Sequence, residues 1–295
     1  MDIGIFGFSP TIDQLRGELQ RAADQGFSSF WMPQIFGLDA LTAIAAAAGD
    51  IDLEIGTSVI PTYPRHPMML AQQALTAQQA VKGSIALGIG LSHQPVVEGM
   101  WGMPFDKPVR HMREYLTALM PLLHDKSTSF AGEVFTSRGA IEVDAPAPPV
   151  LVAALGPQML KVTGRLADGT ITWMVGPKTL GELTTPVINE AAEAAGKPAP
   201  RIVAGVPVCV TDDVEAARAT AATTYAIYGQ LPSYRAMLDR EGLEGPADLA
   251  IIGSAAEVTE RIAAFADSGV TTFAASEFGS ADEQAATRAA LVSML

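Results

Sequence analysis

A turn in the middle of the chain has the composition of an anion-binding site. Ala154-Leu155-Gly156-Pro157-Gln158-Met159 leads from an apolar run into a predicted helix. The first amide donors of a helix lack partners within it, and the helix dipole is positive at that end. Gly156 lets an anion approach the backbone closely and Pro157 suits the first helical turn, so the segment can bind phosphate without lysine. An ordinary strand-to-helix turn has the same spacing, and both interpretations stand.

Histidines mark two further candidate positions. His93 follows an apolar run, where it is a candidate proton donor or ring contact, although a lone histidine is more often structural. The rigid segment 61–67 (PTYPRHP) holds Arg65 and His66 near a helix start, as helix caps or, for Arg65, as a donor to an anion. No cluster of histidine, cysteine and carboxylates occurs, so no metal site is expected.

Short apolar runs alternate with helical patterns along the chain, which predicts βα units and a parallel sheet. Eight such runs predict an α/β fold of the (β/α)8 TIM barrel type. A doubly wound sheet is the alternative, but no GxGxxG follows the first run. We expect one domain, 1–295, with a surface excursion at 126–143 and a helical insert at about 212–250. The predicted strands are 3–8, 27–32, 53–60, 84–91, 150–154, 169–174, 202–210 and 270–275.

The carboxyl ends of the predicted strands are aromatic and rich in small residues. Barrel enzymes place their chemistry at these ends, and here they carry Phe6, Trp31 and Trp173 without a lysine suited to a Schiff base. Such a lining suits a flat, largely apolar ring, with the chemistry supplied by a cofactor. The alternative is that these aromatic side chains only plug the barrel. No GxSxG or HExxH motif is present.

The composition of the chain limits the classes of molecule that it can be expected to bind. Of the 295 residues, 48% are hydrophobic and 17% charged, which excludes a disordered chain. The net charge of −13 disfavours nucleic acid. The longest apolar stretch is far shorter than the roughly 20 residues of a membrane span. With one cysteine and no signal-peptide pattern, we expect a cytoplasmic protein that acts on a small-molecule substrate.

Several runs in order resemble the bacterial luciferase-like flavin oxidoreductases, and most closely their deazaflavin (coenzyme F420)-dependent branch. The resemblance spans nearly the whole chain and implies the same eight-stranded barrel. The runs are IGTSVIPTYPRHPMMLAQQA, IALGIGLSH, REYLTALMPLL with FAGEVF, PPVLVAALGPQMLKVTGRLADGT and VTERIAAFADSGVTTF.

The resemblance implies roles for individual positions. Ser58 and Val59 match a non-prolyl cis peptide that bulges the third strand against the cofactor ring, and Trp173 matches a pocket wall. Gln34 and Ile35 stand where many relatives have Asp-His, a departure that leaves Gln34 as a possible hydrogen-bond partner of the ring edge. The cofactor phosphate turn corresponds to Ala154, Gly156, Pro157, Gln158 and Met159.

These features together predict hydride transfer between coenzyme F420 and a small organic substrate, with His93 as the proton donor. The resemblance also allows a two-component monooxygenase that uses reduced FMN and oxygen, or a non-catalytic cofactor-binding protein. A homodimer is a further expectation, since relatives often form one. Its candidate face comprises the alanine-rich helix 40–48 and the methionine-rich start of the helix 67–81, which could equally pack on the barrel.

Overall fold

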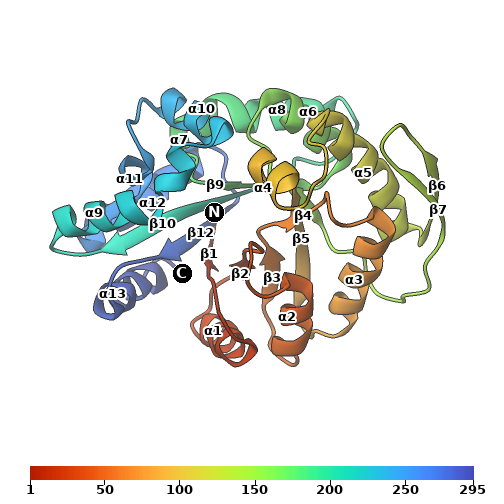
Figure 1. The fold of residues 1–295 in the computed structure, drawn as a ribbon. Coiled ribbons are helices and arrows are strands. Elements are labelled where there is room, and N and C mark those ends of the chain that lie inside the picture. Colours follow the sequence, from red (N-terminus) through yellow and green to blue (C-terminus); the bar gives the residue numbers. More distant parts are fainter.

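Parallel strands close into a barrel in the computed structural model, which describes residues 1–295 (Figure 1). Each strand pairs with the next around the ring, and the last pairs with the first through Gly4 and Ala274. The predicted TIM barrel is confirmed. In order around the ring, its strands are β1 (Asp2–Phe6), β2 (Ser29–Met32), β3 (Glu54–Thr57), β5 (Ser84–Gly90), β8 (Val150–Val152), β9 (Gly169–Trp173), β10 (Arg201–Val210) and β12 (Thr272–Glu277).

Helices cover the outside of the barrel and start where the sequence places capping residues. Asp39 Oδ1 accepts the amide of Thr42 at 3.0 Å, and Thr11 Oγ1 accepts that of Gln14 at 3.3 Å. The helices between barrel strands in the first two thirds of the chain are α1 (Ile12–Asp24), α2 (Ala40–Ala47), α3 (Pro67–Gln79), α4 (Gln94–Gly99), α5 (Pro108–His124) and α6 (Pro157–Leu166). Those that follow are α7 (Pro177–Thr179), the π-helical turn 180–184, α8 (Thr185–Glu193), α12 (Ala255–Asp267) and α13 (Ala281–Val292).

The third predicted strand is interrupted in the structure. A cis peptide joins Ser58 and Val59, as the resemblance implied, so the run 53–60 divides into β3 and the two-residue β4 (Ile60–Pro61). A short strand that the sequence analysis missed, β11 (Ile251–Gly253), pairs with the carboxyl end of β10 outside the ring. Its three residues are too few to show a period.

Two segments depart from the βα alternation. The first is the antiparallel hairpin of β6 (Ser127–Ala131) and β7 (Thr136–Ala140), which lies outside α5 at the right edge of Figure 1. The second is the helical insert after β10. It comprises α9 (Val214–Thr224), the 3-10 turn 226–229, α10 (Pro232–Glu241) and α11 (Pro246–Leu249).

Trp31 fills the interior of the barrel. Its side chain is fully buried, and its Nε1 donates to Ser29 Oγ at 2.9 Å. The guanidinium of Arg201 lies 5.2 Å from the ring centroid and pairs with Glu54 at the amino ends of the strands. For Trp31, the structure therefore supports the plug interpretation. The small residues and aliphatic side chains that pack around it in the lumen are Ala86, Leu151, Ile171, Val203 and Ala274.

The Trp31 ring lies so close to β3 that only glycine fits at position 56. A Cβ on Gly56 would lie 2.1 Å from the ring, whereas one on Gly17, in exposed α1, would meet nothing within 4 Å. We expect Gly56→Ala to lower the free energy of unfolding by about 1–3 kcal/mol through overpacking. The matched Gly17→Ala should raise it by roughly 0.5–1 kcal/mol, because a helical glycine is costly. Urea denaturation measures both; equal stability of the two variants would contradict this packing.

Candidate active site

A cavity of about 520 Å³ opens at the carboxyl ends of the barrel strands. Its floor and walls come from the ends of β3, β5, β8 and β9, from the starts of α4 and α6, and from the insert. Half of its lining residues are hydrophobic and none carries a carboxylate, ammonium or guanidinium group. They are Ser58, Val59, Gly90, Leu91, Ser92, His93, Gln94, Pro95, Phe105, Ala153, Leu155, Gly156, Met159, Ile171, Thr172, Trp173, Leu231, Pro232, Ser233 and Tyr234.

The cis peptide forms one wall of this cavity. Both Ser58 and Val59 line it, and Val59 also packs against the cluster around Trp31. Glycines on β5 make room for this backbone: a Cβ on Gly90 would lie 2.6 Å from Val59 Cγ2, and one on Gly88 would lie 1.8 Å from the carbonyl oxygen of Thr57. The wall is therefore an apolar surface of backbone and valine methyl groups, suited to the face of a flat ring.

The start of α6 lies at another edge of the cavity. Gly156 is the N-cap, and no side chain caps this helix. The space above its Cα is open, since a Cβ placed there would meet no atom within 4 Å. Gly156 and Met159 line the cavity, so the open N-terminus adjoins it. An anionic group attached to a ligand in the cavity can reach these backbone donors.

The structure brings some of the predicted site residues together and separates others. Those that line the cavity are Ser58, Val59, His93, Gly156, Met159 and Trp173. Ala154 faces the core instead and is fully buried. Pro157 and Gln158 are exposed on α6 and do not belong to the lining. The turn therefore faces the cavity through Gly156 and Met159 rather than along its whole length.

Gln34 and Arg65 have structural roles here. The Gln34 side-chain oxygen accepts the amide of Ala40 at 3.0 Å, which satisfies a donor at the start of α2. Arg65 is largely buried and forms an ion pair with Asp39. Neither residue lines the cavity, so the expected contact of Gln34 with a ring edge, and of Arg65 with an anion, is not what the structure presents.

The loop after the first strand also lies elsewhere. Phe6, Gly7 and Phe8 line a separate groove between α1 and α13, which contains the ion pair of Arg288 and Glu277. The loop after the first strand therefore does not line the cavity described above. Phe6 still supports the site from behind, since its ring stacks on that of Trp173 at a centroid distance of 4.6 Å.

The insert supplies a cavity wall that the sequence analysis did not identify by residue. Leu231, Pro232, Ser233 and Tyr234, at the start of α10, line the side opposite the barrel. A row of aromatic contacts holds them in place: the centroid of Tyr228 lies 6.1 Å from that of Trp173 and 4.9 Å from that of Tyr234. The spacing of tyrosines around Pro232 was the available signal, but it does not show which way the insert folds.

The far end of α10 is tied to the barrel by Glu241. Its Oε1 accepts the amide of Thr179, the third residue of α7, at 2.6 Å. The carboxylate lies directly over Gly176, where a Cβ would be 2.5 Å from it. The first residues of α10 therefore line the cavity, and its last residue contacts the segment that follows β9. These two contacts fix the position of the wall.

Burial keeps the titratable side chains of the cavity neutral near pH 7. It lowers the pKa of His93 below its usual 6.5, because no counter-charge compensates for the lost solvation of the imidazolium. Burial also raises the pKa of Tyr234, which remains a phenol. Their rings lie 5.8 Å apart, so two neutral hydrogen-bonding groups face the same space.

No group of three or more His, Cys, Asp and Glu side chains is arranged to hold a metal ion. No helix has both the length and the apolar content that crossing a bilayer requires.

Comparisons with known proteins agree with this architecture. An uncharacterized protein of Mycobacterium tuberculosis, Rv1360, is 30% identical over 248 residues, which cover 76% of this chain and 73% of the relative. The coenzyme F420 dependent tetrahydromethanopterin reductase from Methanopyrus kandleri is 20% identical and superimposes with a TM-score of 0.80, covering 99% of this chain and 96% of that one.

A flavoprotein has the same fold. The oxygenating constituent of 3,6-diketocamphane monooxygenase from Pseudomonas putida, solved with FMN, superimposes with a TM-score of 0.77 at 18% identity, covering 99% of this chain and 96% of that one. The sequence model of the luciferase-like monooxygenase family matches residues 4–272. The chain is therefore an oxidoreductase that belongs to the luciferase-like monooxygenase family.

Proposed function

We propose that this oxidoreductase binds coenzyme F420 and transfers a hydride between it and a small organic substrate. The observation that carries the proposal is the uncapped start of α6 beside an uncharged cavity, one wall of which is formed by Ser58 and Val59. This combination offers an apolar surface to a ring and backbone donors to a phosphate at its edge. A reductase of similar fold uses the same cofactor, which supports the choice.

The residues present fit such a group. Val59 and the backbone of Ser58 would lie against one face of the ring, and the amides after Gly156 would bind the phosphate. When bound, the deazaflavin supplies or takes up the hydride. The chain orients the two reactants and excludes water, which removes much of the entropic barrier. Trp173, stacked on Phe6, keeps the adjacent wall rigid.

His93 exchanges the proton in this proposal. Its imidazole lies on the cavity beside Tyr234 and is neutral near pH 7, so it can accept the proton of a substrate hydroxyl. In the reverse direction the imidazolium returns the proton to the oxygen of the carbonyl. Because burial lowers the pKa of His93, the basic form is available down to a lower pH than for a free histidine.

Cofactor binding tests the proposal through Gly156. We expect Gly156→Asp to weaken coenzyme F420 binding on the order of tenfold or more, because a carboxylate opposes the phosphate at close range. The free energy of unfolding should change by only roughly a few tenths of a kcal/mol, since aspartate is a good N-cap. Gly156→Asn, of equal size and without charge, is the control. Fluorescence titration measures the affinity. Equal binding by the two variants would show that the phosphate does not bind at this turn.

The same titration separates the competing functions. Tight binding of FMN without binding of coenzyme F420, together with oxygen-dependent turnover, would favour a two-component monooxygenase. The fold shared with an FMN-bound monooxygenase keeps that candidate open. Binding of coenzyme F420 without turnover of any substrate in a broad panel of alcohols and ketones would favour a cofactor-binding protein instead.

The proton-transfer role predicts a pH profile. For alcohol oxidation, kcat/KM should be level above pH 6.5 and fall at lower pH as His93 is protonated, because its pKa lies below 6.5. His93→Ala should remove this acidic limb and lower kcat on the order of 100-fold. His124→Ala, at the exposed end of α5, should leave the profile unchanged. An unaltered acidic limb in His93→Ala would exclude His93 as the base.

A further inference from the structure

We infer that the substrate is an uncharged, largely apolar alcohol or carbonyl compound, and that anionic analogues such as keto acids are rejected. The inference rests on the proposed function and deepens it. It starts from the cavity lining, in which no residue is Asp, Glu, Lys or Arg. Two other cavities of the chain differ in this respect: one is lined by Glu18, Arg21 and Arg288, and the other by Asp106, Lys107 and Arg110.

Once the phosphate of the cofactor occupies the amides at the start of α6, a carboxylate elsewhere in this cavity would have no counter-ion. His93 cannot serve, because burial disfavours its charged form, and Tyr234 is a neutral phenol. Burying an unpaired ion costs far more than burying a hydrogen-bonded neutral oxygen. The net charge of −13 adds a field that repels anions approaching the mouth.

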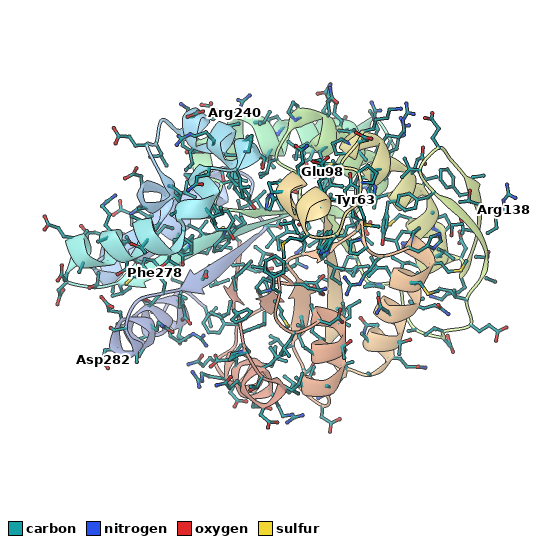
Figure 2. The ribbon with its side chains drawn as sticks, in the orientation of Figure 1. Tyr63, Glu98, Arg138, Arg240, Phe278 and Asp282 are labelled. Carbon is teal, nitrogen blue, oxygen red and sulfur yellow. The ribbon has the colours of Figure 1, made fainter.

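The cationic side chains nearest in sequence to this wall point elsewhere. Arg235 is engaged with Asp239 at 2.8 Å and with the carbonyl oxygens of Leu243 and Glu244. Arg240 is exposed at the outer end of α10, on the top edge of the molecule in Figure 2. The insert therefore presents only Leu231, Pro232, Ser233 and Tyr234 to the cavity and keeps its arginines outside.

The polar groups that remain in the cavity, on His93 and Tyr234, can both hydrogen-bond to a single uncharged oxygen of the substrate. His93 and Tyr234 both line the cavity, and their ring centroids lie 5.8 Å apart. In oxidation of an alcohol the carbon loses a hydride, with its electron pair, to the deazaflavin, and the oxygen loses its proton to His93, leaving a carbonyl. The rest of the substrate contacts Leu91, Leu155 and Leu231.

A matched pair of ketones tests the inference: 4-methylcyclohexanone and 4-oxocyclohexanecarboxylate, which differ in a methyl and a carboxylate. We expect the neutral ketone to be reduced with at least 100-fold higher kcat/KM. Ligand-observed NMR should show the same order of binding to the protein without cofactor, in a phosphate buffer whose anion occupies the start of α6. That readout keeps the inference distinct from the proposed function, because failure to bind coenzyme F420 leaves it unaffected. Preference for the carboxylate, or binding of neither ketone, overturns the inference.

A positive charge placed on the insert wall should weaken the preference for the neutral ketone. Ser233→Lys puts an ammonium on the cavity, and we expect it to narrow the gap between the two ketones at least tenfold. Ala236→Lys adds the same charge to the same helix at an exposed position outside the lining, and the gap should stay as in the unmodified chain. An equal change in both variants would assign the effect to the overall field and would overturn the role of the uncharged wall.

Discussion

A closed ring of parallel strands encloses a lumen that side chains must fill, and in this chain the Trp31 ring meets that requirement. The ring occupies the amino half of the lumen, where Gly56 makes space for it and the Arg201–Glu54 pair closes it from below. Ala86, Val203 and Ala274 complete the packing. Because the lower half is filled, the carboxyl half can remain hollow without opening a channel through the barrel.

The walls of the cavity above are held in place by this packing. Val59 packs against the Trp31 cluster and also lines the cavity, so the core fixes the position of this wall. Phe6 does so on the other side, through its stack on Trp173. A site built on such supports needs few polar groups, and those that it has are neutral. Orientation and exclusion of water are then its main means of acting on a bound reactant.

Local patterns predicted the barrel well and the site in part. The apolar runs, Asp39 as an N-cap and the turn at Gly156 each depend on neighbouring residues, so their positions could be predicted from the sequence. The cis peptide at Ser58 came from resemblance, because no local pattern demands it. The wall at Tyr234 could not be predicted, since its place depends on contacts of the insert with Trp173, a residue about sixty positions away. The hydrogen bond of Gln34 to the amide of Ala40 could not be predicted, because a side chain that caps a backbone amide resembles, in sequence, one that faces a ligand.

The contact of Glu241 with the start of α7 has a consequence for ligand orientation. β8 and β9 are neighbours in the barrel, and each is followed by a helix that begins with proline after glycine. At α7 the chain's own carboxylate accepts the amide of Thr179 and covers Gly176, whereas at α6 the space above Gly156 stays open. Of these two adjacent helix starts, the one at α7 is therefore covered by a carboxylate of the chain itself. In the proposed binding mode, the anionic end of the ligand therefore lies at α6 rather than at α7, although no cationic side chain lines the cavity.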